Sequence, residues 1–104
     1  KVEFSEAKDG VIGMESAFGV LNSALNIEHS IEKITTNPKN IFGIENHTIQ
    51  EGNIADVTLF NPDLEYIFTK NHIASTSKNS PFINKKLKGN VYGVFANNQL
   101  ILNE

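Results

Sequence analysis

Cysteine is absent from the sequence, which excludes disulfide bonds and thiolate metal sites. Because disulfides are rare in the cytosol, this absence fits a cytoplasmic protein, and we expect that location. There is no run of about 18 consecutive apolar residues, so we expect no membrane span. The first residues carry no apolar secretory signal, and since the chain does not begin with methionine we expect its natural start to lie upstream.

Arginine is absent as well. All nine basic residues are lysines, twelve residues are acidic, and the net charge is −3. The planar guanidinium group that binds phosphate and guanine through two hydrogen bonds is therefore missing. An acidic chain of this kind is a poor nucleic-acid binder, so we expect neither nucleic acid nor a membrane among its partners.

The residues that are present describe a small globular unit whose two halves differ. Of the 104 residues, 39% are hydrophobic and 20% are charged, as in folded domains rather than disordered chains. Apolar residues recur at helical spacing in residues 1–46 and at the alternating spacing of strands in residues 47–104. This change of period predicts an α+β fold with a boundary near residue 46.

The first half predicts three helices. One runs from near Gly13 to just before Asn26, on an apolar stripe of Met14, Phe18, Leu21 and Leu25. Asn26 is expected to cap a second helix, whose apolar face is Ile27, Ile31 and Ile34. Asn37 and Pro38 together are typical of a helix start, so a short third helix should begin there and end at Gly43 in the left-handed conformation.

The second half predicts a small antiparallel sheet. A strand over residues 55–60 should be followed by a turn at residues 61–63 and an extended stretch at residues 66–69. Residues 70–90 are rich in Ser, Asn and Lys and predict a long surface loop.

A hairpin is predicted at the end of the chain. Residues 91–96 and 100–102 flank Asn97 and Asn98, which suit a two-residue turn because asparagine tolerates positive φ. So few strands leave exposed sheet edges unless others pair with them, which indicates that the unit is incomplete.

Residues that could perform chemistry are few. His29, His47 and His72 form no HxH or HExxH pattern, and we expect all three to be solvated surface residues. The serines near residue 77 lack the GxSxG pattern of an activated nucleophile. We therefore predict no catalytic residue and no metal ligand within this chain.

Five motifs, in order along nearly the whole chain, resemble one family. Residues 10–18 (GVIGMESAF) resemble the G-[IV]-x-G-[LM]-E-[ST]-A-[FL] segment of dihydroorotases, and residues 34–43 (ITTNPKNIFG) resemble that family's LTxNPxxIFGL helix. Residues 51–60 resemble the E-G-x-x-A-D signature of amidohydrolases, while residues 75–82 and 87–91 resemble the SKSKNTPF loop and the LxGxV strand entry. The first motif together with the loop favours dihydroorotase over hydantoinase or allantoinase.

The resemblance implies a fold. Dihydroorotases have a metal-dependent (β/α)8 barrel and a small β-sandwich built from both ends of the chain. Residues 1–46 would be the last loop and helices of the barrel, and residues 47–104 the C-terminal strands of the sandwich. The rest of the barrel would then be a partner of this chain.

It also implies a reaction, the reversible hydrolysis of dihydroorotate to N-carbamoyl-aspartate in pyrimidine synthesis. In the family, a zinc-bound hydroxide attacks the ring carbonyl while an aspartate moves the proton. The ligands are an HxH pair, a carboxylated lysine, two further histidines and the aspartate of a DHAPH motif. Neither HxH nor DHAPH occurs here, so we expect this chain alone to be inactive and to bind no zinc.

One substrate contact of the family maps onto this sequence. The backbone just before the G-x-x-G segment touches the substrate ring in family members, which assigns Asp9 and Gly10 as substrate-binding residues. The family usually has Pro-Phe or a similar pair there, whereas this sequence has Lys8 and Asp9. Gly10 needs no side chain for a backbone contact; the alternative is that it serves only the turn.

Two other functions stay open. The chain could belong to a non-catalytic dihydroorotase-like subunit or interaction module, which the residues upstream of Lys1 would reveal. It could also belong to another cyclic amidase, a hydantoinase or allantoinase, which the choice of substrate would reveal.

Exposed apolar side chains predict self-association of the isolated chain. Met14, Phe18 and Leu21 would normally face the rest of a barrel, and uncovered apolar patches seek partners. Sedimentation over a range of concentrations should show species larger than a monomer. A strictly monomeric chain at high concentration would contradict this expectation.

Overall fold

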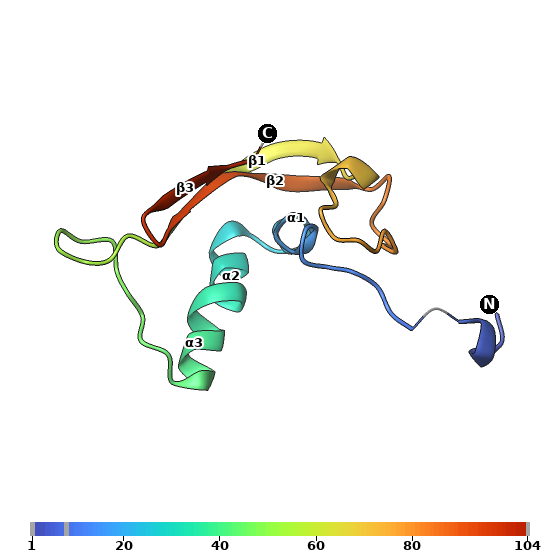
Figure 1. Ribbon diagram of the computed structural model, residues 1–104, viewed down its shortest axis with the longest axis horizontal. Helices are drawn as coiled ribbons and strands as arrows, with labels where there is room; N and C mark the ends of the chain where they lie inside the picture. The colour runs from blue at the N-terminus through green and yellow to red at the C-terminus, as the bar shows by residue number, and fades with distance from the viewer. Residues whose placement is uncertain (1, 8, 104) are drawn as a thin grey trace.

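The computed structural model describes residues 2–7 and 9–103. Its sheet is antiparallel, with three strands in the order β1-β2-β3. The helices lie on one side of this sheet, with α1 directly beneath the strands and α2 and α3 leading away from them (Figure 1). The α+β class predicted from the change of period is confirmed. Within the described residues, no helix has the length and apolar character needed to cross a membrane.

Helix α1 (Ala17–Ala24) begins later than the predicted start near Gly13. A tight turn precedes it, in which Ala17 N–H donates to the Met14 carbonyl at 3.4 Å and the Ser16 hydroxyl donates to the Gly13 carbonyl at 3.3 Å. Residues 10–13, ahead of this turn, form no helix.

Helix α2 (Ile27–Ile31) confirms the predicted cap. The Asn26 side chain accepts a hydrogen bond from His29 N–H at 2.8 Å, which satisfies one of the free N–H groups of the first turn. The predicted apolar face is only partly covered: Ile27 and Ile31 are half-buried, while Ile34 is 42% exposed.

A third helix begins at Asn37 as predicted, but Asn37 does not cap it, because the chain is already helical ahead of it. Helix α2 continues through the π-helical turn η2 (Glu32–Thr36) into α3 (Asn37–Phe42), and Asn37 is itself helical, with φ −65° and ψ −47°. Proline lacks an N–H and crowds the preceding turn of an α-helix. The wider π turn ahead of Pro38 absorbs that conflict, so the helix does not end.

Gly43 ends α3 as predicted. Its φ of +65° lies in the left-handed region, and Ile44 N–H turns back to donate to the Lys39 carbonyl at 2.8 Å. Residues 44–56 then contain no helix or strand and lead to the sheet.

The predicted turn at residues 61–63 is also wrong. Strand β1 (Val57–Ile67) runs through it and pairs with β2 (Lys86–Ala96), with the register interrupted between Asn61 and Glu65. Pro62 has no N–H for the ladder, so pairing stops there and resumes beyond it.

Residues 70–90 are not a surface loop throughout. After η3 (Lys70–His72) the chain buries Ile73, and β2 begins at Lys86 rather than near residue 91. Ile73 is 4% exposed and forms the core with Phe68 and Leu87. Because the segment is mostly polar, its composition did not indicate that Ile73 is part of the core.

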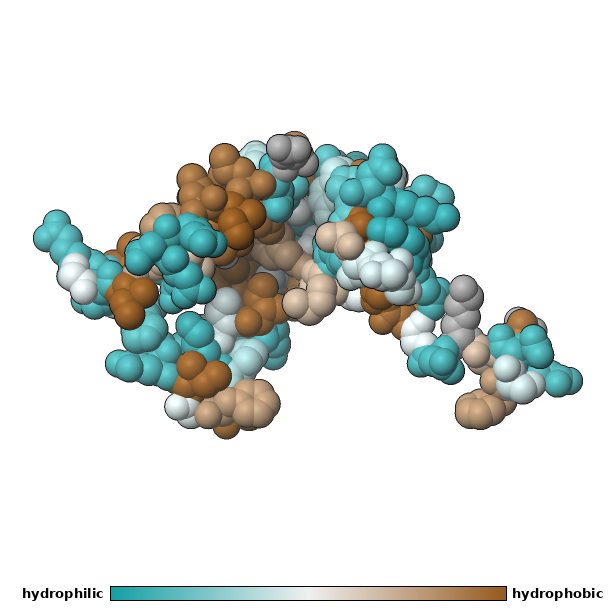
Figure 2. All heavy atoms as spheres, viewed as in Figure 1, coloured by the Kyte–Doolittle hydropathy of each residue, from teal (hydrophilic) through white to brown (hydrophobic). Residues whose placement is uncertain are grey.

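The predicted hairpin is confirmed. Asn97 and Asn98 have φ of 51° and 58°, and Ala96 pairs with Gln99 at the start of β3 (Gln99–Leu102). All four residues of β3 are exposed, and apolar side chains gather at this end of the sheet (Figure 2).

The exposure expected of the first helix is found only in part. Met14 is 88% exposed, whereas Phe18 is half-buried and meets the Phe60 ring edge-on, with the ring centroids 5.1 Å apart. Leu21 is half-buried too. The sheet of this chain therefore covers part of the face that we assigned to the barrel.

Asn22 joins α1 to both long strands. Its side-chain amide is buried and donates to the Pro62 carbonyl at 2.8 Å and to the Lys88 carbonyl at 2.9 Å. Gly89, with φ +110°, leaves room for this approach, since a Cβ there would lie 2.9 Å from the Asn22 amide nitrogen and 2.8 Å from the Phe18 ring.

Replacing Asn22 should destabilise the fold. In Asn22→Ala, two carbonyls lose their donor in a place that water reaches poorly, and we expect the free energy of unfolding to fall by about 2–4 kcal/mol. Urea unfolding followed by circular dichroism would measure the change. Asn71→Ala, on an exposed turn, is the matched control and should change stability by less than about 0.5 kcal/mol; equal effects of the two variants would refute the assigned role of Asn22.

Candidate functional site

The predicted substrate-binding residues Asp9 and Gly10 lie in a segment that is held in place by a loop about 70 residues further along the chain. Ile12 N–H donates to the Asn79 backbone carbonyl at 2.9 Å, and the Asn79 side-chain amide donates to the Gly10 carbonyl. Asp9 and Gly10 are both exposed, and no atom lies within 4 Å of where a Cβ on Gly10 would be. Lys8 lies outside the described residues.

Glu15 fastens the same two segments at a second point. Its Oε1 accepts from the Ser75 N–H at 2.8 Å and from the Ser75 hydroxyl at 2.5 Å. These hydrogen bonds, first the hydroxyl and then the N–H, hold the pKa of the Glu15 carboxyl below its ordinary value. Its other oxygen, Oε2, is buried and has no hydrogen-bond partner in the described part of the chain.

Spacing along the sequence does not predict this contact. Glu15 and Ser75 are 60 residues apart, so no periodicity relates them. Both do lie within motifs that resemble dihydroorotases, at residues 10–18 and 75–82. That shared membership is the one signal that could have paired them.

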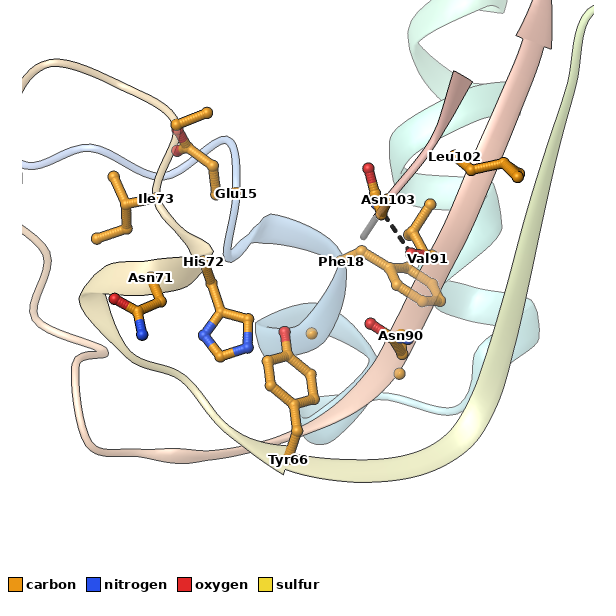
Figure 3. Close-up of a pocket in the computed structure, with 13 residues that line it drawn as sticks. Glu15, Phe18, Tyr66, Asn71, His72, Ile73, Asn90, Val91, Leu102 and Asn103 are labelled. Carbon is orange, nitrogen blue, oxygen red and sulfur yellow. Dashed lines mark hydrogen bonds between the residues drawn. The ribbon is translucent and has the colours of Figure 1, made fainter. Parts of the chain in front are cut away.

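A pocket of about 460 Å³ opens beside this contact (Figure 3). Tyr66 and His72 lie on one side of it, with Phe18, Asn90 and Asn103 across from them. Burial raises the pKa of the Tyr66 hydroxyl, which lies so close to α1 that a Cβ on Gly19 would be 2.7 Å from its oxygen.

His72 has a structural task in this pocket. Its Nδ1 accepts from Thr69 N–H at 3.0 Å and also lies 3.0 Å from the Thr69 hydroxyl, so the ring caps the turn η3. The ring also stacks on Phe68, with centroids 5.7 Å apart. Nδ1 is therefore engaged in this cap, and Nε2 is the ring nitrogen that takes no part in it.

The residues that the structure describes do not fit a zinc site. His29, His47 and His72 are all exposed. Among residues 2–7 and 9–103, no three His, Cys, Asp or Glu side chains come together in a way that could hold a metal ion. The structure brings together Gly10, Ile12 and Glu15 with the 73–80 loop, an arrangement of backbone groups, amides and one carboxylate.

Comparison with curated proteins finds relatives that share one name. Over 103 residues the chain is 33% identical to "Dihydroorotase" of Chlorobaculum tepidum, an alignment that takes in 93% of this chain and 24% of that protein. It is 40% identical over 94 residues to "Dihydroorotase" of Endomicrobium trichonymphae, covering 84% of this chain and 22% of the relative. The chain is homologous to dihydroorotases.

A third dihydroorotase, from Acetivibrio thermocellus, is 35% identical over 109 residues, which cover 99% of this chain and 26% of that protein. The dihydroorotase-like chain thus spans about a quarter of the length of the curated relatives it matches. No family model matches it. The family resemblance drawn from the five motifs is confirmed.

Glu15 should make stability depend on pH. Because its folded pKa is lowered from 4.5, the charged carboxylate stabilises the fold above that pH, and the benefit is lost as the pH falls through the folded pKa. The advantage of the wild type over Glu15→Gln in urea unfolding should therefore be largest near neutral pH and shrink on going down to about pH 3.

The control for this prediction removes one negative charge elsewhere. Glu51→Gln lies in an exposed turn, and its difference from the wild type should change little over the same pH range. An advantage of Glu15 that stays constant from neutral to acid pH would contradict the role of its charge.

Proposed function

We propose that this chain is the C-terminal part of a dihydroorotase, the enzyme that reversibly hydrolyses dihydroorotate to N-carbamoyl-aspartate in the cytoplasm. The observation that carries the proposal is the identity of 33–40% to proteins named dihydroorotase along 84–99% of this chain. The agreement of five motifs in family order supports it, because a chance match would not preserve their order.

We further propose that residues 1–46 complete the (β/α)8 barrel and that residues 47–104 supply strands of the β-sandwich. The switch from helices to strands across the irregular residues 44–56 supports this division. The open edge at β3 supports pairing with further strands of the sandwich. The two parts are joined closely, since Ser23 Oγ on α1 accepts from Lys88 N–H on β2 at 2.8 Å.

Zinc enters the proposal as a group held outside this chain. The described residues do not fit a zinc site, so the chain's proposed contribution to the active site is the backbone at Asp9 and Gly10. The open space beside the Gly10 Cα supports this role, because nothing lies within 4 Å of where a Cβ would be and a ring can approach from that side. Dihydroorotate, a ring with carbonyl and N–H groups, can hydrogen-bond to such a backbone.

The test is to compare the full-length protein that contains this sequence with the 104-residue chain. We expect the full-length protein to bind zinc and to hydrolyse dihydroorotate faster than hydantoin or allantoin. The 104-residue chain should bind no stoichiometric zinc and show no turnover. A preference for hydantoin, a full-length protein inactive on all three rings, or turnover by the short chain would each overturn the proposal.

A further inference from the structure

We propose that Asn79 is a positioning residue for the substrate-contacting backbone at Gly10. The inference depends on the proposed function, because it requires Gly10 to meet the substrate. Asn79 lies in the loop between η3 and β2, 69 residues from Gly10. It reaches the segment ahead of α1 through both its backbone and its side chain.

The two hydrogen bonds of Asn79 hold the peptide groups on either side of Val11. The Asn79 carbonyl accepts from Ile12 N–H at 2.9 Å, and the side-chain amide donates to the Gly10 carbonyl. A glycine backbone has no preferred conformation of its own, and nothing packs within 4 Å of the missing Cβ at Gly10 or Gly13. Ile12 packs against the core, and at Gly10 itself the contact that holds the backbone is the hydrogen bond from the Asn79 side chain.

Asn79 is in turn fixed to the core. The loop that carries it starts at Ile73, which is 4% exposed, and Lys78 Nζ donates back to the Ile73 carbonyl at 2.6 Å. Ser75 ties the same loop to Glu15 through two hydrogen bonds. The Gly10 carbonyl is thus connected to the apolar core through Asn79 and the loop that begins at Ile73.

The chemistry of the contact requires an amide. The group that faces the Gly10 carbonyl must donate, and the Asn79 amide nitrogen does so. A carboxylate of the same shape would present a second acceptor to that carbonyl and push the two apart. Asn79→Asp should therefore disturb Gly10 at least as much as Asn79→Ala, which only removes the donor.

The experiment measures steady-state kinetics of the zinc-loaded full-length protein on dihydroorotate. In Asn79→Ala we expect KM to rise about 10-fold while kcat stays within about 2-fold, because a displaced backbone contact weakens substrate binding before it affects the reacting bond. Asn79→Asp should raise KM by at least as much. Thr76→Ala, at an exposed position of the same loop, is the matched control and should leave both constants unchanged.

Thermal unfolding of each variant separates positioning from folding. A purely structural role would lower the melting temperature and the active fraction, and hence the apparent kcat, and leave KM as it was; that result overturns the inference. If Asn79→Ala does not fold, the isosteric Asn79→Asp decides the same comparison. A wild-type protein that does not turn over dihydroorotate overturns the proposed function and this inference with it, whereas an active wild type with an unchanged KM in the variants overturns the inference alone.

Discussion

The side-chain amide of Asn22 is the interaction on which the packing of helix against sheet depends. Strand pairing fails around Pro62, and the Asn22 amide provides a donor to the Pro62 carbonyl and another to the Lys88 carbonyl on the facing strand. Gly89 adjoins this point and has no side chain to keep the helix away. One residue thereby satisfies the interrupted ladder and fixes α1 against β1 and β2.

This constraint matters because the apolar core is small. Phe68, Ile73 and Leu87 form it, while many large apolar side chains remain on the surface. Polar contacts between distant segments therefore do much of the positioning, at Asn22, at Glu15 and at Asn79. The segment that carries Gly10 is ordered by such contacts together with the packing of Ile12 against the core.

Local features of the fold could be predicted from the sequence. The cap at Asn26, the left-handed Gly43 and the turn at Asn97 and Asn98 each depend on residues a few positions apart. Two of the errors arose where distant residues decide the outcome. Pro62 continues a strand because Asn22 satisfies its carbonyl, and an apparent surface loop is anchored by Ile73 in the core.

The candidate site divides in the same way. The family resemblance predicted Asp9 and Gly10 as substrate-binding residues ahead of the first helix. In the structure both residues lie there and are exposed. The hydrogen bond from Asn79 to this segment could not be predicted, because the two residues are 69 positions apart and no sequence periodicity relates them. Spacing rules reach one or two helical turns, and this contact lies far beyond them.

The 66-residue separation between Asn22 and Lys88 has a consequence for biosynthesis. A ribosome delivers α1 long before it delivers the strand that α1 binds, so the nascent helix waits with its apolar side chains uncovered while the intervening chain is made. Docking follows only after Lys88 has cleared the exit tunnel. Newly made protein is thus most exposed to chaperones and proteases during this interval.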